Sequence, residues 1–183
     1  MKWLVIGLLA SIPLSGCMPE LKVANVDNGG LIQAKEGRKL GQADVTKSTK
    51  FPLNHYKEMA FFSSNQYYFQ YGYDQLKSFN HFNQVLKYND LEKIVIANNL
   101  QDKVINLDSQ IGLSRFANNY KPFLWIRLYP KQENNKNYLT LVVTNPVNAE
   151  DLFEARTWHD GQTDEALLYP LFNALSVWIK ENQ

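Results

Sequence analysis

Three short segments in the C-terminal half decide the fold: FLWIRLY (123–129), YLTLVVT (138–144) and LFEARTW (152–158). Each is rich in β-branched and aromatic residues, and polar, turn-rich stretches separate them. This pattern is typical of strands joined by turns. Pro122 stands just before the first segment, where a strand can begin. The three segments therefore predict a three-stranded antiparallel meander.

Alternation along these strands divides their side chains into two faces, because successive side chains point to opposite sides of a strand. One face is uniformly apolar and should pack against helices; it carries Leu124, Ile126, Leu128, Leu139, Leu141, Val143, Phe153 and Ala155. The other, which we call the mixed face, combines aromatic, charged and hydroxyl side chains. It carries Phe123, Trp125, Arg127, Tyr129, Tyr138, Thr140, Val142, Thr144, Leu152, Glu154, Arg156 and Trp158.

The mixed face has two interpretations. Interface cores are enriched in Tyr, Trp and Arg, and aromatic rings beside polar groups could also stack on the sugars of cell-wall glycan. The candidate partner-binding residues are then Trp125, Arg127, Tyr129, Tyr138, Glu154, Arg156 and Trp158. Alternatively, Arg127, Glu154 and Arg156 form cross-strand ion pairs that only stabilise the sheet. The N-terminal segment or residues 65–73 could also cover this face.

Upstream of the meander, hydrophobic periodicity predicts four further elements. They are a strand at 58–64, an amphipathic helix at 74–88, a strand at 91–97 and a helix at 107–120. Residues 65–73 fit either a second short strand or the approach to a helix, and residues 91–97 fit a short helix as the alternative.

Downstream of the meander, Thr163 can cap a last helix that runs to about Lys180. Pro170 lies inside it, so the helix either kinks there or begins there. The complete order is β-α-β-α-β-β-β-α. It predicts a two-layer α+β domain, with a mostly antiparallel sheet and helices on one face.

The N-terminus, MKWLVIGLLASIPLSGC (1–17), has the layout of a secretory signal peptide. Lys2 is followed by an apolar stretch too short to span a bilayer, which takes about 20 helical residues. LSGC at 14–17 resembles the lipobox of bacterial lipoproteins. The resemblance implies that the signal peptide is cut before Cys17 and that this cysteine, the only one in the chain, carries the lipid anchor. In well-studied lipoproteins, Asp directly after the cysteine favours retention in the inner membrane. The resemblance therefore implies that this protein, which has Met18 at that position, is sent to the outer membrane.

Residues 17–56 then read as a lipidated N-terminus and flexible tether, and residues 57–183 as a single periplasmic domain. The tether segment contains DNGG (27–30) and has no sustained period of 3.6 or 2. Its basic residues outnumber its acidic ones between Lys35 and Lys50. Contact with anionic lipid or cell wall is one interpretation, and a solvated spacer is the other.

Composition narrows the class of partner. Of the 183 residues, 45% are hydrophobic, which is enough for one sizeable core, and the formal net charge is +1. Cleavage before Cys17 removes Lys2 and no acid, which reduces 19 basic residues to 18 and matches the 18 acids. Proteins that bind nucleic acid carry a basic face or stripe. The sequence has no such run, so we expect no nucleic-acid partner.

No motif indicates catalysis. The three histidines show no zinc-binding spacing, and neither a nucleophile elbow nor a glycine-rich phosphate loop occurs. We therefore expect no catalytic residue, metal or cofactor. The element order and the lipid anchor are loosely similar to small periplasmic domains of outer-membrane lipoproteins that assist cell-envelope machines, such as activators of peptidoglycan synthases. The sequence indicates an envelope accessory or binding protein whose partner is an envelope protein or peptidoglycan; a periplasmic hydrolase is the alternative.

Lipidation at Cys17 is directly testable. Replacing Cys17 by Ser should leave an unacylated precursor that keeps its signal peptide, because the thioether cannot form. Intact-mass spectrometry of the unsubstituted protein should show a chain that starts at residue 17 and carries lipid. An unmodified thiol at position 17 of the exported protein would contradict the lipobox interpretation.

Overall fold

The computed structural model describes residues 21–33, 40–161 and 163–183. The predicted signal peptide and lipobox, with Cys17 and Met18, lie outside these residues, so lipidation stays a prediction. Within the described ranges, no helix is long and apolar enough to cross a membrane.

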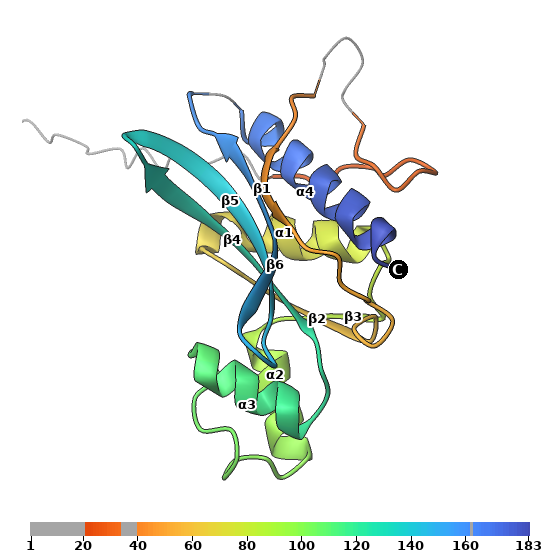
Figure 1. Ribbon diagram of the computed structural model, residues 1–183, viewed down its shortest axis with the longest axis vertical. Coiled ribbons are helices and arrows are strands. Elements are labelled where there is room, and N and C mark those ends of the chain that lie inside the picture. The colour runs from red at the N-terminus through yellow and green to blue at the C-terminus, as the bar shows by residue number, and fades with distance from the viewer. Residues whose placement is uncertain (1–20, 34–39, 162) are drawn as a thin grey trace, which may run out of the picture.

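Six strands form one open sheet in the order β1-β6-β5-β4-β2-β3 (Figure 1). The strands are β1 (Asp44–Ser48), β2 (Met59–Ser64), β3 (Gln84–Leu86), β4 (Leu124–Glu133), β5 (Lys136–Asn145) and β6 (Glu150–Trp158). Strands β1, β6, β5 and β4 pair antiparallel, whereas β2 pairs in parallel with both β4 and β3. The predicted α+β class, the mostly antiparallel sheet and the meander are confirmed.

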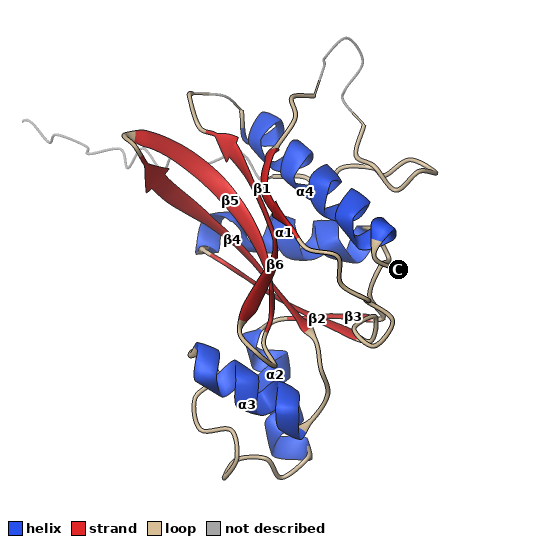
Figure 2. Ribbon diagram, viewed as in Figure 1, coloured by secondary structure: helices blue, strands red, loops and turns tan. Residues whose placement is uncertain are grey.

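Four helices accompany the sheet: α1 (Gln66–Ser78), α2 (Tyr88–Ala97), α3 (Gln110–Asn119) and α4 (Asp164–Glu181). Helices α1 and α4 form the predicted helical layer. Helices α2 and α3 lie together at one end of the sheet (Figure 2). They share an apolar cluster with Met59 and Phe61 of β2, which alternate with the core-facing Ala60, and with Phe123, which directly precedes β4.

The main core lies between the sheet and the layer of α1 and α4. All eight residues of the predicted apolar face are at most 1% exposed and belong to this core. Gly72 allows α1 to approach β2 closely, because a Cβ at this position would lie 2.3 Å from Cζ of Phe62. From α4, the side chains of Phe172 and Trp178 are almost fully buried.

Two local predictions were wrong. The helix expected at 74–88 is α1 at Gln66–Ser78, capped by Asn65, whose side chain accepts a hydrogen bond from the Tyr68 amide at 3.1 Å. The chain turns at Asn80, which has a φ of 56°, and the following apolar residues enter β3 rather than continue the helix. The strand expected at 91–97 is helix α2, the alternative considered for that segment.

The other upstream elements agree with the sequence. Strand β2 and helix α3 lie where a strand at 58–64 and a helix at 107–120 were predicted. Thr163 is the N-cap residue of α4, and Pro170 lies inside that helix.

The described part of the predicted tether packs on the domain instead of forming a solvated spacer. Strand β1 extends the sheet by pairing with β6, and Leu53 and Ile32 are each only 1% exposed. The Trp178 indole donates to the Thr49 carbonyl at 3.1 Å. The pattern was missed because all five residues of β1 are exposed, so this edge strand shows no alternation.

Residues 21–33 are fastened to the helical layer by two side-chain amides. Gln75 on α1 accepts from the amide of Ala24 at 2.9 Å and donates to its carbonyl at 3.3 Å. Asn173 on α4 does the same for Ile32, at 2.7 and 3.0 Å. Each amide satisfies both backbone groups of one residue, as a neighbouring strand would.

Removing residues 1–56 should therefore destabilise the domain. We expect a chain of residues 57–183 to lose about 3 kcal/mol or more in free energy of unfolding, because it lacks the buried Leu53 side chain and the β1–β6 pairing. Chemical denaturation against a chain of residues 21–183 measures the loss. Equal stability of the two chains would show that the segment contributes nothing to the fold.

Candidate functional site

Strand register brings all seven candidate residues of the mixed face to one side of the sheet. Tyr138 lies opposite Trp158, and Thr140 lies between Tyr129 and Arg156. Six of the seven are partly exposed, and Trp158 is 48% exposed. The seven candidate residues are Trp125, Arg127, Tyr129, Tyr138, Glu154, Arg156 and Trp158.

Five of the twelve residues assigned to this face by alternation are buried and do not contribute to its surface: Phe123, Thr140, Val142, Thr144 and Leu152. Phe123 is buried in the cluster with α2 and α3. Leu152 is buried in the main core, because an irregularity between Val143 and Thr144 shifts the pairing of β5 with β6. The bulge places Asp151, rather than Leu152, opposite Thr144.

Arg127 organises one end of the mixed face. Its guanidinium donates to Thr144 Oγ1 at 2.8 Å and to Asp151 Oδ1 at 2.9 Å. The same guanidinium lies 4.4 Å from the ring centroid of Trp125, whose indole nitrogen donates to Ser63 Oγ at 2.8 Å. Charge-assisted hydrogen bonds and the cation–π contact hold Trp125 and Arg127 in one arrangement.

Arg156 organises the other end. Its Nε donates to Asp44 at 2.9 Å, a second nitrogen pairs with Glu133, and the guanidinium lies 4.6 Å from the ring centroid of Tyr138. Lys131 bridges Glu133 at 3.1 Å and Glu154 at 3.9 Å. The hydrogen bond from Lys131, with Arg156 adding to it, holds the pKa of the Glu133 carboxyl below its usual range.

The cross-strand ion pairs considered from the sequence therefore exist, but with partners that the sequence analysis missed. Those partners are Asp44, Lys131, Glu133 and Asp151. Lys131 and Glu133 continue the alternation of β4 beyond Tyr129, so a longer reading of that strand would have found them. Asp44 lies on the unrecognised edge strand, and Asp151 reaches the face through the bulge, so neither had a local signal.

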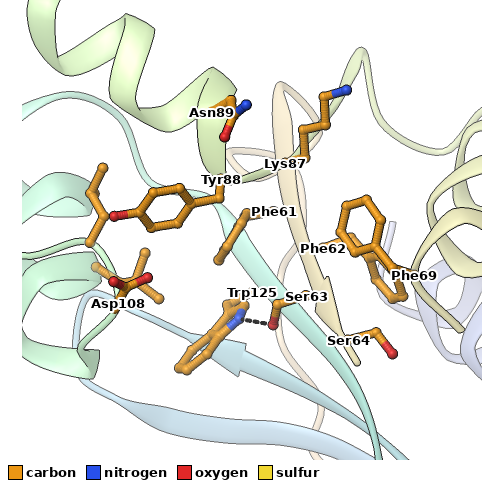
Figure 3. Close-up of a pocket in the computed structure, with 12 residues that line it drawn as sticks. Phe61, Phe62, Ser63, Ser64, Phe69, Lys87, Tyr88, Asn89, Asp108 and Trp125 are labelled. Atoms are coloured by element: carbon orange, nitrogen blue, oxygen red, sulfur yellow. Dashed lines mark hydrogen bonds between the residues drawn. The ribbon is translucent and has the colours of Figure 1, made fainter. Parts of the chain in front are cut away.

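Two cavities adjoin the mixed face. One, of about 510 Å³, lies beside its Arg156 end; it is lined by Tyr138, Arg156 and Trp158, by the segment that leads into β1, and by the first turns of α4. The other, of about 500 Å³, opens beside Trp125 between the sheet and helices α1, α2 and α3 (Figure 3). The described residues contain no group of three or more histidines, cysteines or acids placed to hold a metal ion.

No protein-family model and no curated protein sequence matches the chain. Among solved structures, the C-terminal domain of LpoB from Salmonella enterica is similar at a TM-score of 0.36 and 9% identity, covering 57% of this chain and 84% of that one. A dodecameric PelC variant from Paraburkholderia phytofirmans is similar at a TM-score of 0.25 and 12% identity, covering 77% and 95%. Both TM-scores are low, so these likenesses assign neither a family nor a function.

The two tryptophans of the face should differ in their effect on stability. Replacing Trp125 by Ser should lower the free energy of unfolding by about 2 kcal/mol or more, because the ring stacks beside Phe61 and holds Ser63. Replacing the exposed Trp158 by Ser should change it by about 0.5 kcal/mol or less. Denaturant unfolding of both variants checks this, and equal losses would mean that Trp158 is part of a second core.

Proposed function

We propose that this chain is a lipid-anchored, non-catalytic binding module of the cell envelope. Cys17 would attach it to the outer membrane, with the domain facing the periplasm. The mixed face would bind an envelope protein or peptidoglycan. The single observation that supports a binding role is the Trp158 end of this face, where an exposed indole stands next to Tyr138 and a cavity.

The chemistry of this end suits an interface core. Trp158 is 48% exposed, and Lys136 Nζ lies 5.2 Å from its ring centroid. The indole ring therefore exposes a large apolar surface to solvent, with one cation beside it. Arg156 is held by Asp44 and Glu133, which pre-organises the charged groups. A partner that covered Trp158 would bury its apolar surface, which favours binding. The ion pairs are already formed, so binding would not have to pay the entropy of ordering them.

Anchoring at Cys17 would keep the domain close to the membrane. Leu21 packs against the main core, and Ala24 is hydrogen-bonded to Gln75 of α1. Position 17 is four Cα-to-Cα steps from position 21, and a fully extended chain of that length spans at most about 14 Å. The mixed face would then act near the membrane surface rather than at the end of a long tether.

Two binding experiments test the proposal. Co-sedimentation with purified peptidoglycan sacculi tests the glycan partner, and affinity purification from crosslinked envelopes tests a protein partner. Replacing Trp158 by Ser should weaken the interaction that is found by tenfold or more, since hot-spot aromatics contribute roughly 2 kcal/mol. Replacing Val177 by Ser is the matched control, because Val177 is similarly exposed, at 42%, on α4.

Equal retention of the two variants would overturn the assignment of the binding surface. Recovery of neither sacculi nor a specific crosslinked partner would contradict the binding role. Release of soluble fragments from the sacculi would support a hydrolase instead.

A further inference from the structure

The cavity beside Trp125 has the size of a small-molecule site. Its volume of about 500 Å³ falls within the range of roughly 300–1,000 Å³ that is usual for ligand pockets. It lies where the parallel strands β2 and β3 end, since Ser63, Ser64 and Lys87 line it.

Five of the twelve residues that line the cavity are aromatic. The rings of Phe61 and Trp125 are stacked at a centroid distance of 6.4 Å and an interplanar angle of 20°. The ring centroids of Phe62 and Phe69 lie 5.8 Å apart, and Tyr88 lies on the opposite side of Phe61 from them (Figure 3). The hydrogen bond from Trp125 to Ser63 and the packing of Phe61, which is 5% exposed, fix the Phe61 and Trp125 part of this wall before any ligand arrives, while Phe62 lies fully buried behind it.

Polar groups on the same lining include both donors and acceptors. Ser63 Oγ accepts from Trp125, which leaves its own hydroxyl proton to donate. Ser64 Oγ donates to the Leu128 carbonyl at 2.8 Å, which leaves its lone pairs to accept. Asn89 adds an amide at the exposed start of α2, and an amide both donates and accepts.

The charges on the rim are balanced. Lys87 and Asp108 lie on opposite sides of the aromatic wall (Figure 3). Desolvation raises the pKa of the Tyr88 hydroxyl above its usual range, and neighbouring Asp108 adds to the rise, so this group stays a neutral phenol. One cation and one carboxylate give the cavity no net preference for an anion or a cation.

These features exclude two ligand classes. A hydrocarbon chain would fit the rings, but it would make no hydrogen bond to the remaining hydroxyl proton of Ser63, the lone pairs of Ser64 or the amide of Asn89. A ligand of single charge would meet an opposite charge at one side of the rim and a like charge at the other, so the rim gives it no net attraction. The lining instead matches a neutral molecule that has a flat C–H face for the rings and several hydroxyl groups around its edge.

We propose that this cavity binds a neutral saccharide unit, with the sugar ring against the aromatic wall and its hydroxyl groups on the rim residues Ser63, Ser64, Lys87, Asn89 and Asp108. The C–H groups of a sugar face suit the electron-rich faces of aromatic rings. This site goes beyond the proposed function, because it is separate from the Trp158 end of the mixed face and either site can be wrong without the other.

Calorimetric titration of the intact chain tests the proposal. The protein is purified with its native N-terminus into phospholipid nanodiscs, or into plain buffer if it carries no lipid. A trisaccharide of N-acetylglucosamine and a trisaccharide of glucose are the two saccharide probes, and they distinguish an amino-sugar glycan from a plain glucan. We expect at least one to bind with a dissociation constant of about 1 mM or less.

Matched variants locate the binding. Asn89→Trp should fill the mouth of the cavity and weaken binding tenfold or more, while the melting temperature stays within the range of the control. Glu92→Trp is that control, since Glu92 is exposed on the same helix and does not line the cavity. Val177→Ser, an exposed substitution on α4 away from the cavity, should also leave saccharide binding unchanged.

Three results would overturn the proposal. The first is that neither saccharide binds. The second is that Asn89→Trp binds as well as Glu92→Trp. The third is that octanoate or a zwitterionic dipeptide binds more tightly than both saccharides, which would make the cavity an acyl-chain or a peptide site.

Discussion

Strand β5 is hydrogen-bonded to β4 on one edge and to β6 on the other, and side chains cover both of its faces. Every residue from Leu139 to Asn145 is buried. On the core side, helices α1 and α4 complete the cluster that contains Leu141 and Val143. On the other side, Thr140 lies between Tyr129 and Arg156 in the register. Long side chains from β4 and β6 therefore shield the middle of the sheet from water.

This shielding layer is also the surface that the protein presents. Arg127 forms an ion pair with Asp151 at one end, and Arg156 forms ion pairs with Asp44 and Glu133 at the other. They fix the geometry and balance the charge of the face rather than offer free cations to a partner. In the proposed binding role, recognition would then fall to the exposed aromatic groups, above all Trp158, which is consistent with a chain of almost zero net charge.

The sequence predicted what is locally encoded. Period-2 alternation identified the meander and both of its faces, because each strand carries the pattern itself. The predicted bounds of the helix at 74–88 were wrong. Phe79 and Leu86 are buried, as the residues of a helical stripe would be, but they lie in a turn and in β3. Strand β1 has no apolar side, and the cavity beside Trp125 draws on segments far apart in the chain. Long-range packing decides these features, and no short window contains them.

Photocrosslinking in living cells tests the central claim, that the mixed face is an accessible binding surface, most directly. A photoreactive amino acid at position 158 should give a specific adduct with one envelope component, because Trp158 stands in water at the centre of the proposed contact. The same group at position 96, which is 63% exposed on α2, should give none. Identical adduct patterns from the two positions, or no adduct from position 158, would contradict the account.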